Sequence, residues 1–318
     1  MANGKTTRVV HGLEELPGRP TGCAATVGNF DGVHRGHQRI LGQARKEADA
    51  RGAAVVAVTF EPAPVRLLAP DKAPEPLMHL EQRCRALGEA GADTVVVLHT
   101  TEALLAMSPE AFVRQVLVEK LGAAVVVEGD NFFFGHNRAG NVRMLRELGG
   151  TLGFDVQVVE PVMIDLAGRQ VRISSSLVRR LIRDGQVADG GRCLGRPYAM
   201  RGTVIRGQGR GQDLGFPTAN LDCGLQLVPA DGVYAGRAFV DDKSYLTAAS
   251  VGTRPTFGVL ARAIEAYLLD YQGGPLYGRS LEVQFAQHLR GQEKYETVDE
   301  LLGQMKQDVQ HVRDFFNQ

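Results

Sequence analysis

Hydrophobic residues in the first half of the chain fall into short continuous runs, and segments of helical periodicity separate these runs. Consecutive apolar, β-branched residues are typical of strands that are buried on both faces. We expect strands at residues 53–60, 94–99 and 123–127. We expect helices at residues 38–51, 79–92 and 109–121. Ser108 and Pro109 are a typical N-cap and first residue for the last helix, and the alternation predicts βαβ units and a parallel sheet.

A different pattern begins after residue 198. Short extended runs are separated there by Gly, Pro and Asp turns, which is typical of an antiparallel barrel or sandwich. The runs cover residues 199–205, 232–239, 246–251, 264–270 and 280–285. An amphipathic helix is predicted at residues 298–316, and residues 185–192 are interpreted as a helix end and a linker. We therefore predict two domains, residues 1–186 and 187–318.

Composition and charge narrow the class of protein. The 318 residues include 36 Lys and Arg and 36 Asp and Glu, so the formal net charge is zero. This balance argues against general binding to nucleic acid or an anionic membrane, but it is compatible with a local phosphate site. The four cysteines lie far apart without a Cys-x-x-Cys pair, which argues against a zinc site or a disulfide framework. No apolar segment resembles a signal core or a membrane span, so we expect a cytoplasmic protein.

The first candidate site follows an apolar run, where glycine breaks the strand pattern. Gly28, Gly32 and Gly36 allow a ligand to approach the backbone, and the N-terminus of the following helix would hold a phosphate. His34 and His37 are three residues apart and face the same way on a first helical turn. Their imidazoles would donate to ATP phosphates and stabilise charge on a transferred phosphoryl group. The pattern His-x-Gly-His is typical of nucleotidyltransferases, and the alternative is a pair of surface or capping histidines.

A second loop is expected at the same edge of the sheet. Residues 129–135 follow a predicted strand and are bounded by glycines, and ligands of parallel sheets bind beyond the carboxyl ends of the strands. Asn131 and Phe132 offer an amide and an aromatic surface to a planar heteroaromatic ligand. The alternative is that the phenylalanines of this loop simply enter the core.

A serine cluster precedes the next helical pattern. Ser174, Ser175 and Ser176 are a good helix N-terminus signal, and Arg179 follows on that helix. Hydroxyl, backbone N–H and guanidinium donors together suit triphosphate oxygens.

Polar residues of the second half indicate another phosphate site. Gly207, Gly209 and Arg210 would cradle a phosphate through N–H groups and one positive charge. Thr218 and Asn220 alternate on one side of an extended segment, where their oxygens would hold Mg²⁺ beside the phosphate. The alternative is a bare glycine-rich hairpin.

Glu265 lies within an apolar strand pattern. A carboxylate in such surroundings would act as a general base that accepts a hydroxyl proton. The alternative is an exposed acidic residue on a strand, which is common.

The ordered set of motifs resembles the bacterial bifunctional riboflavin kinase/FAD synthetase family over nearly the whole chain. The first half carries Gly-Asn-Phe-Asp-Gly-Val-His-x-Gly-His, Gly-x-Asn-Phe-x-Phe-Gly and Arg-Ile-Ser-Ser-Ser, and the second half carries Leu-Gly-Phe-Pro-Thr-Ala-Asn-Leu, Pro-Ala-Asp-Gly-Val-Tyr and Gly-x-x-Pro-Thr-Phe. The resemblance implies an α/β Rossmann-like nucleotidyltransferase domain with a parallel sheet. It also implies a following six-stranded antiparallel β-barrel with a C-terminal helix.

The resemblance implies two successive reactions. The second domain would phosphorylate riboflavin to FMN with ATP and Mg²⁺, and the first would transfer AMP from ATP to FMN, giving FAD and pyrophosphate. The family's kinase positions correspond to Gly207, Gly209 and Arg210 for phosphate, Thr218 and Asn220 for phosphate and metal, and Glu265 as the catalytic base. The adenylyltransferase positions correspond to Gly28, Phe30, His34, Gly36, His37, Arg172, Ser174, Ser175, Ser176 and Arg179 for ATP, and to Asn131 and Phe132 for the flavin.

Three positions depart from the family pattern. Ala63 stands where the family usually has a histidine near the adenylyl-transfer site, Arg254 replaces an asparagine, and Tyr267 replaces a histidine after Glu265. Two alternatives therefore stay open, a relative with one activity weakened or redirected (the adenylyltransferase first) and a non-catalytic flavin-binding regulator. We expect small-molecule partners, without nucleic acid or membrane, and leave a weak homo-oligomer open.

Overall fold

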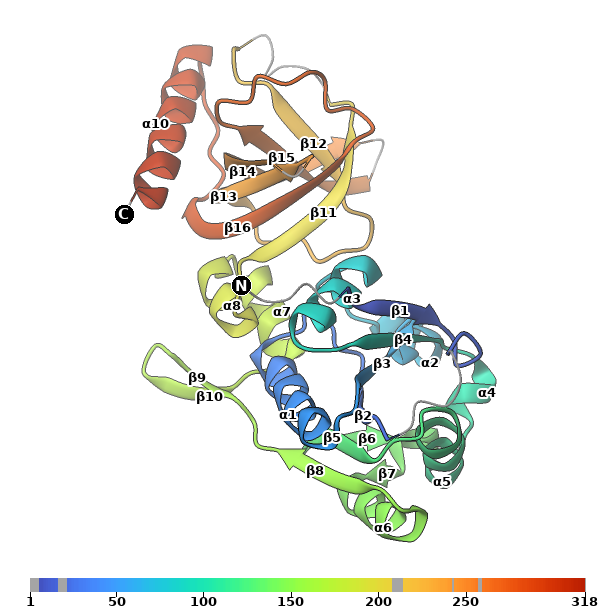
Figure 1. The fold of residues 1–318 in the computed structure, drawn as a ribbon. Coiled ribbons are helices and arrows are strands. Elements are labelled where there is room, and N and C mark those ends of the chain that lie inside the picture. Colours follow the sequence, from blue (N-terminus) through green and yellow to red (C-terminus); the bar gives the residue numbers. More distant parts are fainter. Residues whose placement is uncertain (1–5, 17–21, 208–213, 242, 257–258, 318) are drawn as a thin grey trace. The chain divides into compact units, whose positions relative to one another are not determined.

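The computed structural model describes residues 6–16, 22–207, 214–241, 243–256 and 259–317 (Figure 1). The chain forms two compact units, the first comprising residues 1–74 and 80–173, and the second residues 75–79 and 174–318. The division follows Ile173, and the domain boundary after residue 186 stays a prediction.

The first unit is built on a six-stranded parallel sheet with the strand order β1-β4-β3-β2-β5-β8. Its strands are β1 (Arg8–His11), β2 (Ala24–Val27), β3 (Val55–Glu61), β4 (Thr94–His99), β5 (Val125–Gly129) and β8 (Asp155–Val159). The parallel sheet and its three predicted strands, β3, β4 and β5, are confirmed. The edge strands β1 and β8 were not predicted, because each is short and has only one buried residue, so neither forms a buried apolar run.

Helices and two small hairpins complete the first unit. The helices are α1 (Arg35–Arg51), α2 (Pro64–Leu68), η1 (Pro70–Lys72), α3 (Leu80–Glu89), α4 (Glu102–Leu105), α5 (Pro109–Phe112), η2 (Val113–Lys120), η3 (His136–Arg138) and α6 (Val142–Leu152). The hairpins pair β6 (Phe133–Phe134) with β7 (Gly140–Asn141), and β9 (Met163–Leu166) with β10 (Arg169–Arg172). The predicted cap is present, because the Ser108 hydroxyl accepts from the N–H of Ala111 at 3.2 Å.

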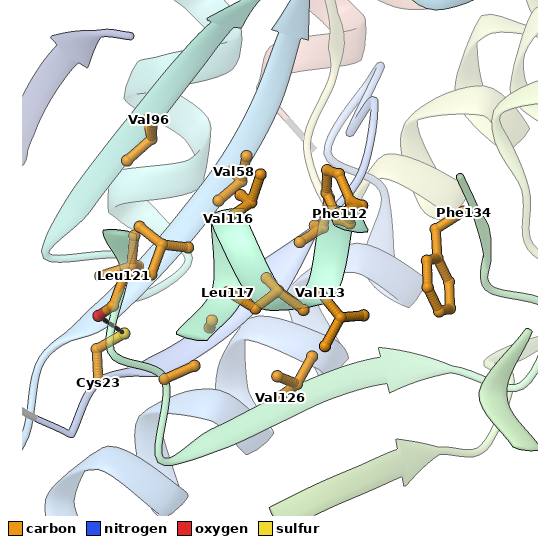
Figure 2. Packing of buried hydrophobic residues seen from close by; sticks show 14 of the residues in the cluster. Cys23, Val58, Val96, Phe112, Val113, Val116, Leu117, Leu121, Val126 and Phe134 are labelled. Carbon is orange, nitrogen blue, oxygen red and sulfur yellow. Dashed lines mark hydrogen bonds between the residues drawn. The ribbon is translucent and has the colours of Figure 1, made fainter. Parts of the chain in front are cut away.

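One hydrophobic cluster of the first unit lies between η2 and one face of the sheet. Figure 2 shows Val113, Val116 and Leu117 of η2 beside sheet residues such as Val58 and Val126, all of them buried. The helix that the apolar spacing predicts at residues 109–121 therefore packs as expected, although its second part is π-helical.

The buried Cys23 thiol lies at one end of this cluster. Its Sγ donates to the carbonyl of Leu121 at 3.3 Å (Figure 2). Burial raises the pKa of Cys23 to about 12, so the thiol stays neutral at physiological pH. All four cysteines are free and buried, as the expectation of reduced thiols requires.

The second unit is a closed antiparallel barrel with the strand order β11-β12-β15-β14-β13-β16. Its strands are β11 (Tyr198–Ile205), β12 (Thr218–Asp222), β13 (Gly232–Val240), β14 (Lys243–Thr256), β15 (Val259–Leu268) and β16 (Ser280–Arg290). Met200, Ala266 and Phe285 are fully buried. The six-stranded antiparallel barrel is confirmed.

Two helices precede the barrel, α7 (Ser175–Arg183) and α8 (Val187–Leu194). The interpretation of residues 185–192 as a linker is wrong, because most of them form α8. Two adjacent glycines conceal the helical pattern, yet Val187, Gly190 and Cys193 are buried on one side of the helix. A β-carbon at Gly190 would lie 2.6 Å from the Ile182 side chain, so this glycine allows close helix packing instead of a turn.

A five-residue segment from the first half of the chain belongs to the second unit. Residues 75–79 lie among residues of that unit. The N–H of Leu227 donates to the Pro76 carbonyl at 2.9 Å, and the buried Gln226 amide donates to the Leu77 carbonyl at 2.9 Å. We call residues 75–79 the inserted strap.

Helix α10 (Val298–Phe316), as predicted, closes the chain and packs against β13 and β14 (Figure 1). A bidentate ion pair holds it there, with Arg290 Nε 2.9 Å from Asp308 Oδ1 and Arg290 Nη2 2.7 Å from Asp308 Oδ2. Asp308 is only 4% exposed. Breaking a buried pair on one side leaves the other charge uncompensated.

We expect Asp308→Ala to lower the free energy of unfolding by about 3–5 kcal/mol, because Arg290 would remain half-buried without its partner. Urea unfolding followed by circular dichroism measures the change. Lys306→Ala alters an exposed charge on the same helix and serves as the control. Equal stability of the two variants would contradict the prediction.

Candidate functional site

The turn after β2 is held in one conformation by backbone contacts. The N–H of Gly28 donates to the Val58 carbonyl of β3 at 3.0 Å, and the N–H of Val33 donates to the Phe30 carbonyl at 3.0 Å. Phe30 and Val33 adopt left-handed backbone angles, with φ of +48° and +37°. Such angles are costly for side-chain-bearing residues and are found where a site demands them. Phe30 is also almost fully buried.

His34 and His37 lie together at the start of α1. His34 is the N-cap, and its Nδ1 accepts from the N–H of His37 at 3.4 Å. The two rings are stacked, with centroids 3.7 Å apart and planes 19° apart. A nitrogen that accepts a hydrogen bond carries no proton, so the proton of neutral His34 is on Nε2. The expectation that these histidines face the same way is confirmed, and His34 is also a cap.

Burial, with a smaller contribution from His34, lowers the pKa of His37 well below its usual value. Phe30 meets the His37 ring edge-to-face at 5.2 Å. The Nδ1 atom of His37 is buried and has no hydrogen-bond partner among the described residues. A β-carbon at Gly36 would lie 3.0 Å from the His34 ring, so glycine leaves room for the stack. The neutral His37 ring therefore lies at a helix N-terminus, where anions bind.

The loop after β5 lies beside this turn, because β2 and β5 are neighbours in the parallel sheet. The prediction that both loops share one sheet edge is confirmed. Asn131 is exposed there. Phe134 is buried, Phe133 is 47% exposed, and Phe132 stacks on Phe134 at 5.2 Å. The alternative that these phenylalanines enter the core is therefore correct for Phe134 and wrong for Phe133.

Arg172 of β10 reaches the same loop. Its Nη1 donates to Asp130 Oδ2 at 2.9 Å, and Nη2 donates to the other oxygen. This hydrogen bonding lowers the pKa of Asp130. A partly exposed guanidinium is therefore fixed in a bidentate pair at the edge of the sheet.

Glu128 is a buried acid that the sequence reasoning missed. Its Oε1 accepts from the N–H of Val27 at 2.6 Å and from the Thr26 hydroxyl at 3.5 Å, and it is 3% exposed. In β2, only Ala24 and Ala25 pair with β5. The Glu128 carboxyl therefore supplies the hydrogen-bond acceptor that the backbone N–H of Val27 would otherwise lack. Desolvation raises the pKa of Glu128 well above its usual value despite these two bonds. The one signal in the sequence is an acid at the end of an apolar run.

We expect Glu128→Gln to stabilise the protein increasingly as the pH rises. A carboxyl whose pKa is raised on folding contributes stability below its unfolded pKa, and this contribution is lost as pH rises through the folded pKa. The slope is about 1.4 kcal/mol per pH unit while the folded state holds the extra proton. Melting temperatures of variant and wild type between pH 5 and 9 measure the difference, with exposed Glu160→Gln as control. A difference that does not depend on pH would refute this account of Glu128.

The serine cluster begins the second unit. Ser174 is the N-cap of α7, and its Oγ accepts from the N–H of Leu177 at 3.2 Å, as predicted for a helix start. Arg179 Nε donates to the carbonyl of Glu75 in the inserted strap at 2.9 Å. Assignment of Ser174, Ser175, Ser176 and Arg179 to a nucleotide stays a prediction.

The second candidate site lies on the outer side of the barrel. Thr218 Oγ1 is 3.2 Å from Glu265 Oε2, and Asn220 lies directly opposite Glu265 in the ladder of β12 and β15. The structure thus brings Glu265 together with Thr218 and Asn220, which sequence reasoning selected from a distant segment. A β-carbon at Gly207 would lie 2.2 Å from the Asn220 amide, so a larger residue there would displace the Asn220 side chain. Gly209 and Arg210, and the side chain of Arg254, lie outside the described residues.

Sequence reasoning missed two further residues of this site. Ser250 on β14 lies opposite Glu265. Gln292 follows β16, and its Nε2 donates to Ser250 Oγ at 3.0 Å and to the Val251 carbonyl at 2.8 Å. Both are polar residues of common types, so only the barrel register reveals them.

The oxygen atoms of this site fit a magnesium ion. Asn220 Oδ1 is buried and has no hydrogen-bond partner among the described residues, next to the Thr218 hydroxyl and the Glu265 carboxylate. Such oxygens are the ligands that Mg²⁺ prefers, usually together with water and substrate phosphates. The described residues contain no group of three or more His, Cys, Asp or Glu that would hold a metal by itself.

Together the two units define a class of protein. The first is an α/β unit with a tight turn and two histidines at one sheet edge, and the second is a six-stranded barrel with a carboxylate beside a hydroxyl and an amide. Family models agree with this division: a FAD synthetase model matches residues 16–177, and a riboflavin kinase model matches residues 194–316.

Whole-chain comparisons identify the family. The chain is 36% identical to the bifunctional riboflavin kinase/FMN adenylyltransferase of Escherichia coli K12 over 98% of both chains. It is 37% identical to that of Pseudomonas fluorescens, over 96% of this chain and 97% of the relative. The chain belongs to the bifunctional riboflavin kinase/FMN adenylyltransferase family.

A solved structure shares the complete fold. The crystal structure described as a macrolide-efflux protein from Streptococcus pneumoniae has a TM-score of 0.86 and 29% identity, and covers 96% of this chain and 98% of its own. In the described part of the present chain, none of the helices has the length and apolar character needed to cross a membrane.

Proposed function

We propose that the protein phosphorylates riboflavin to FMN in its barrel and transfers AMP from ATP to FMN in its first unit, releasing pyrophosphate. The observation that carries this proposal is the cluster of Thr218, Asn220 and Glu265, three residues expected from the motifs and joined by the barrel register. Relatives that span the whole chain and carry both names support two activities. A weakened or non-catalytic relative is not favoured.

In the kinase reaction, Glu265 takes the proton of the ribityl 5′-hydroxyl as its oxygen attacks the γ-phosphorus of ATP, and ADP leaves. Thr218 Oγ1, at 3.2 Å, orients the carboxylate. Asn220 Oδ1 and Thr218 would hold Mg²⁺, which neutralises phosphate charge when bound. Gly207 keeps Asn220 in place by close approach, and Gly209 and Arg210 are proposed to contact phosphate.

In the adenylyl transfer, a phosphate oxygen of FMN attacks the α-phosphorus of ATP and pyrophosphate leaves. His34 and His37 offer N–H donors to the oxygens where charge develops. Gly28, Phe30 and Gly36 shape the turn that receives the phosphates.

Further residues are proposed to bind the nucleotide and the flavin. Arg172, Ser174, Ser175, Ser176 and Arg179 would contact ATP, and Asn131 and Phe132 would contact the flavin. We further propose a cytoplasmic protein with small-molecule partners only. A weak homo-oligomer stays open.

The proposal is tested by product analysis. The purified protein is incubated with riboflavin, ATP and Mg²⁺, and in a second reaction with FMN in place of riboflavin, and the flavins are separated by chromatography. We expect FMN and FAD in the first reaction and FAD in the second. Absence of both products would refute the proposal, and FMN without FAD would show that the chain, with Ala63, has lost the adenylyl transfer.

A further inference from the structure

Arg83 is a buried cation within the first unit that the two reactions do not use. It lies on α3 and is 5% exposed. Its Nη2 contacts Glu61 Oε2 at 2.5 Å, and its Nε is buried without a hydrogen-bond partner among the described residues. Taking a guanidinium out of water is expensive, so its placement needs a specific set of partners.

Those partners are the carboxyl ends of two adjacent strands. Arg83 Nη2 donates to the Phe60 carbonyl of β3 at 3.1 Å, and Nη1 donates to the Asn29 carbonyl after β2 at 3.3 Å. The Thr59 hydroxyl donates to the same Asn29 carbonyl at 3.2 Å. One side chain thus joins the turn that carries the paired histidines to the segment that begins at Glu61.

These bonds fix the direction of one peptide group. In a planar trans peptide the carbonyl and the N–H point in opposite directions. Because the Asn29 carbonyl is held toward β3 and α3, the N–H of Phe30 points away from Arg83. This N–H has no hydrogen-bond partner in the part of the chain that the structure describes, and Phe30 has the left-handed φ of +48°. A free N–H at such a turn is a ready donor to an anion.

We propose that Arg83 is a positioning residue for the adenylyl transfer. It holds the Asn29–Phe30 peptide so that the Phe30 N–H donates to a phosphate oxygen of ATP. The inference rests on the proposed function of the first unit. Arg83 itself does not touch the nucleotide.

Arg83→Lys tests this role because lysine keeps the positive charge near Glu61 but lacks the planar fork that reaches two carbonyls and a carboxylate together. With FMN and saturating ATP, we expect kcat for FAD formation to fall about 10²-fold, since small displacements of reacting groups have effects of that size. In Arg83→Met, which also lacks the positive charge, kcat for FAD formation should fall further. Arg85→Lys, an exposed position on the same helix, is the matched control and should stay within about twofold of wild type.

The kinase reaction separates this role from a loss of folding. Riboflavin phosphorylation by the same variants occurs in the second unit, and it should keep its wild-type rate at a temperature well below the melting point. Two results would overturn the inference: unchanged FAD formation in Arg83→Lys, or equal losses of both activities together with a lowered melting temperature. Failure of the proposed function is distinguished at once, because the wild type would then make no FAD from FMN.

Discussion

Replacement of Glu265 by glutamine should abolish nearly all riboflavin phosphorylation, with kcat for FMN formation lower by about 10²–10⁴-fold. Glutamine has almost the same shape, and it still accepts a hydrogen bond from Thr218, which lies 3.2 Å from the carboxylate. It cannot accept the proton of the attacking hydroxyl. The expected loss is therefore in chemistry, with the affinity for riboflavin nearly unchanged.

Two controls make this result specific. FAD formation from supplied FMN should be unaffected in Glu265→Gln, since it takes place in the other unit. Glu282→Gln changes a half-buried acid on barrel strand β16 and should leave both activities intact. An active Glu265→Gln kinase would remove Glu265 from the catalytic role and leave it as an ordinary strand residue.

His37→Ala should lower FAD formation from FMN by about 10²–10³-fold, the effect of removing one preorganised donor to a developing oxyanion. The loss of the ring also removes the stacking partner of His34, at 3.7 Å, and the edge contact of Phe30. Kinase activity should stay at the wild-type level. His99→Ala alters an exposed histidine at the carboxyl end of β4 and is the matched control.

The lowered pKa of His37 gives this prediction a pH signature. Because the folded protein holds His37 neutral below the ordinary pKa of 6.5, protonation of this ring should not reduce FAD formation as the pH falls from 8 to 6. The unfolded chain binds a proton there below about pH 6.5, so stability decreases toward acid pH. A rate that falls in step with a histidine of ordinary pKa would contradict a neutral His37.

The sequence predicted those features that local patterns determine. The strands at the centre of the sheet are buried on both faces. The N-caps Ser108 and Ser174 each accept a hydrogen bond from the backbone N–H three residues later in the sequence. Thr218 and Glu265 were selected separately from local residue patterns and the family's motifs, and the barrel then brought them together.

The features that escaped prediction depend on distant partners. Glu128 and Val27 are 101 residues apart, and Arg83 and Asn29 are 54 residues apart. Nothing near an isolated acid or base in the sequence shows which carbonyl or N–H the fold will place beside it. Helix α8 was missed for another reason, because Gly190 allows close packing against Ile182, whereas adjacent glycines usually signal a turn.

The inserted strap has a consequence for the independence of the two halves. Since residues 75–79 belong to the second unit, the polypeptide passes between the units three times. Cleavage of one peptide bond therefore cannot divide the chain into the two units. A barrel produced from residue 187 onward would leave Gln226 and Leu227 without the carbonyl acceptors that the strap supplies. Residues 75–79 therefore complete the second unit although they lie within the sequence of the first. A truncated or recombined protein that is meant to keep the kinase activity should include this segment.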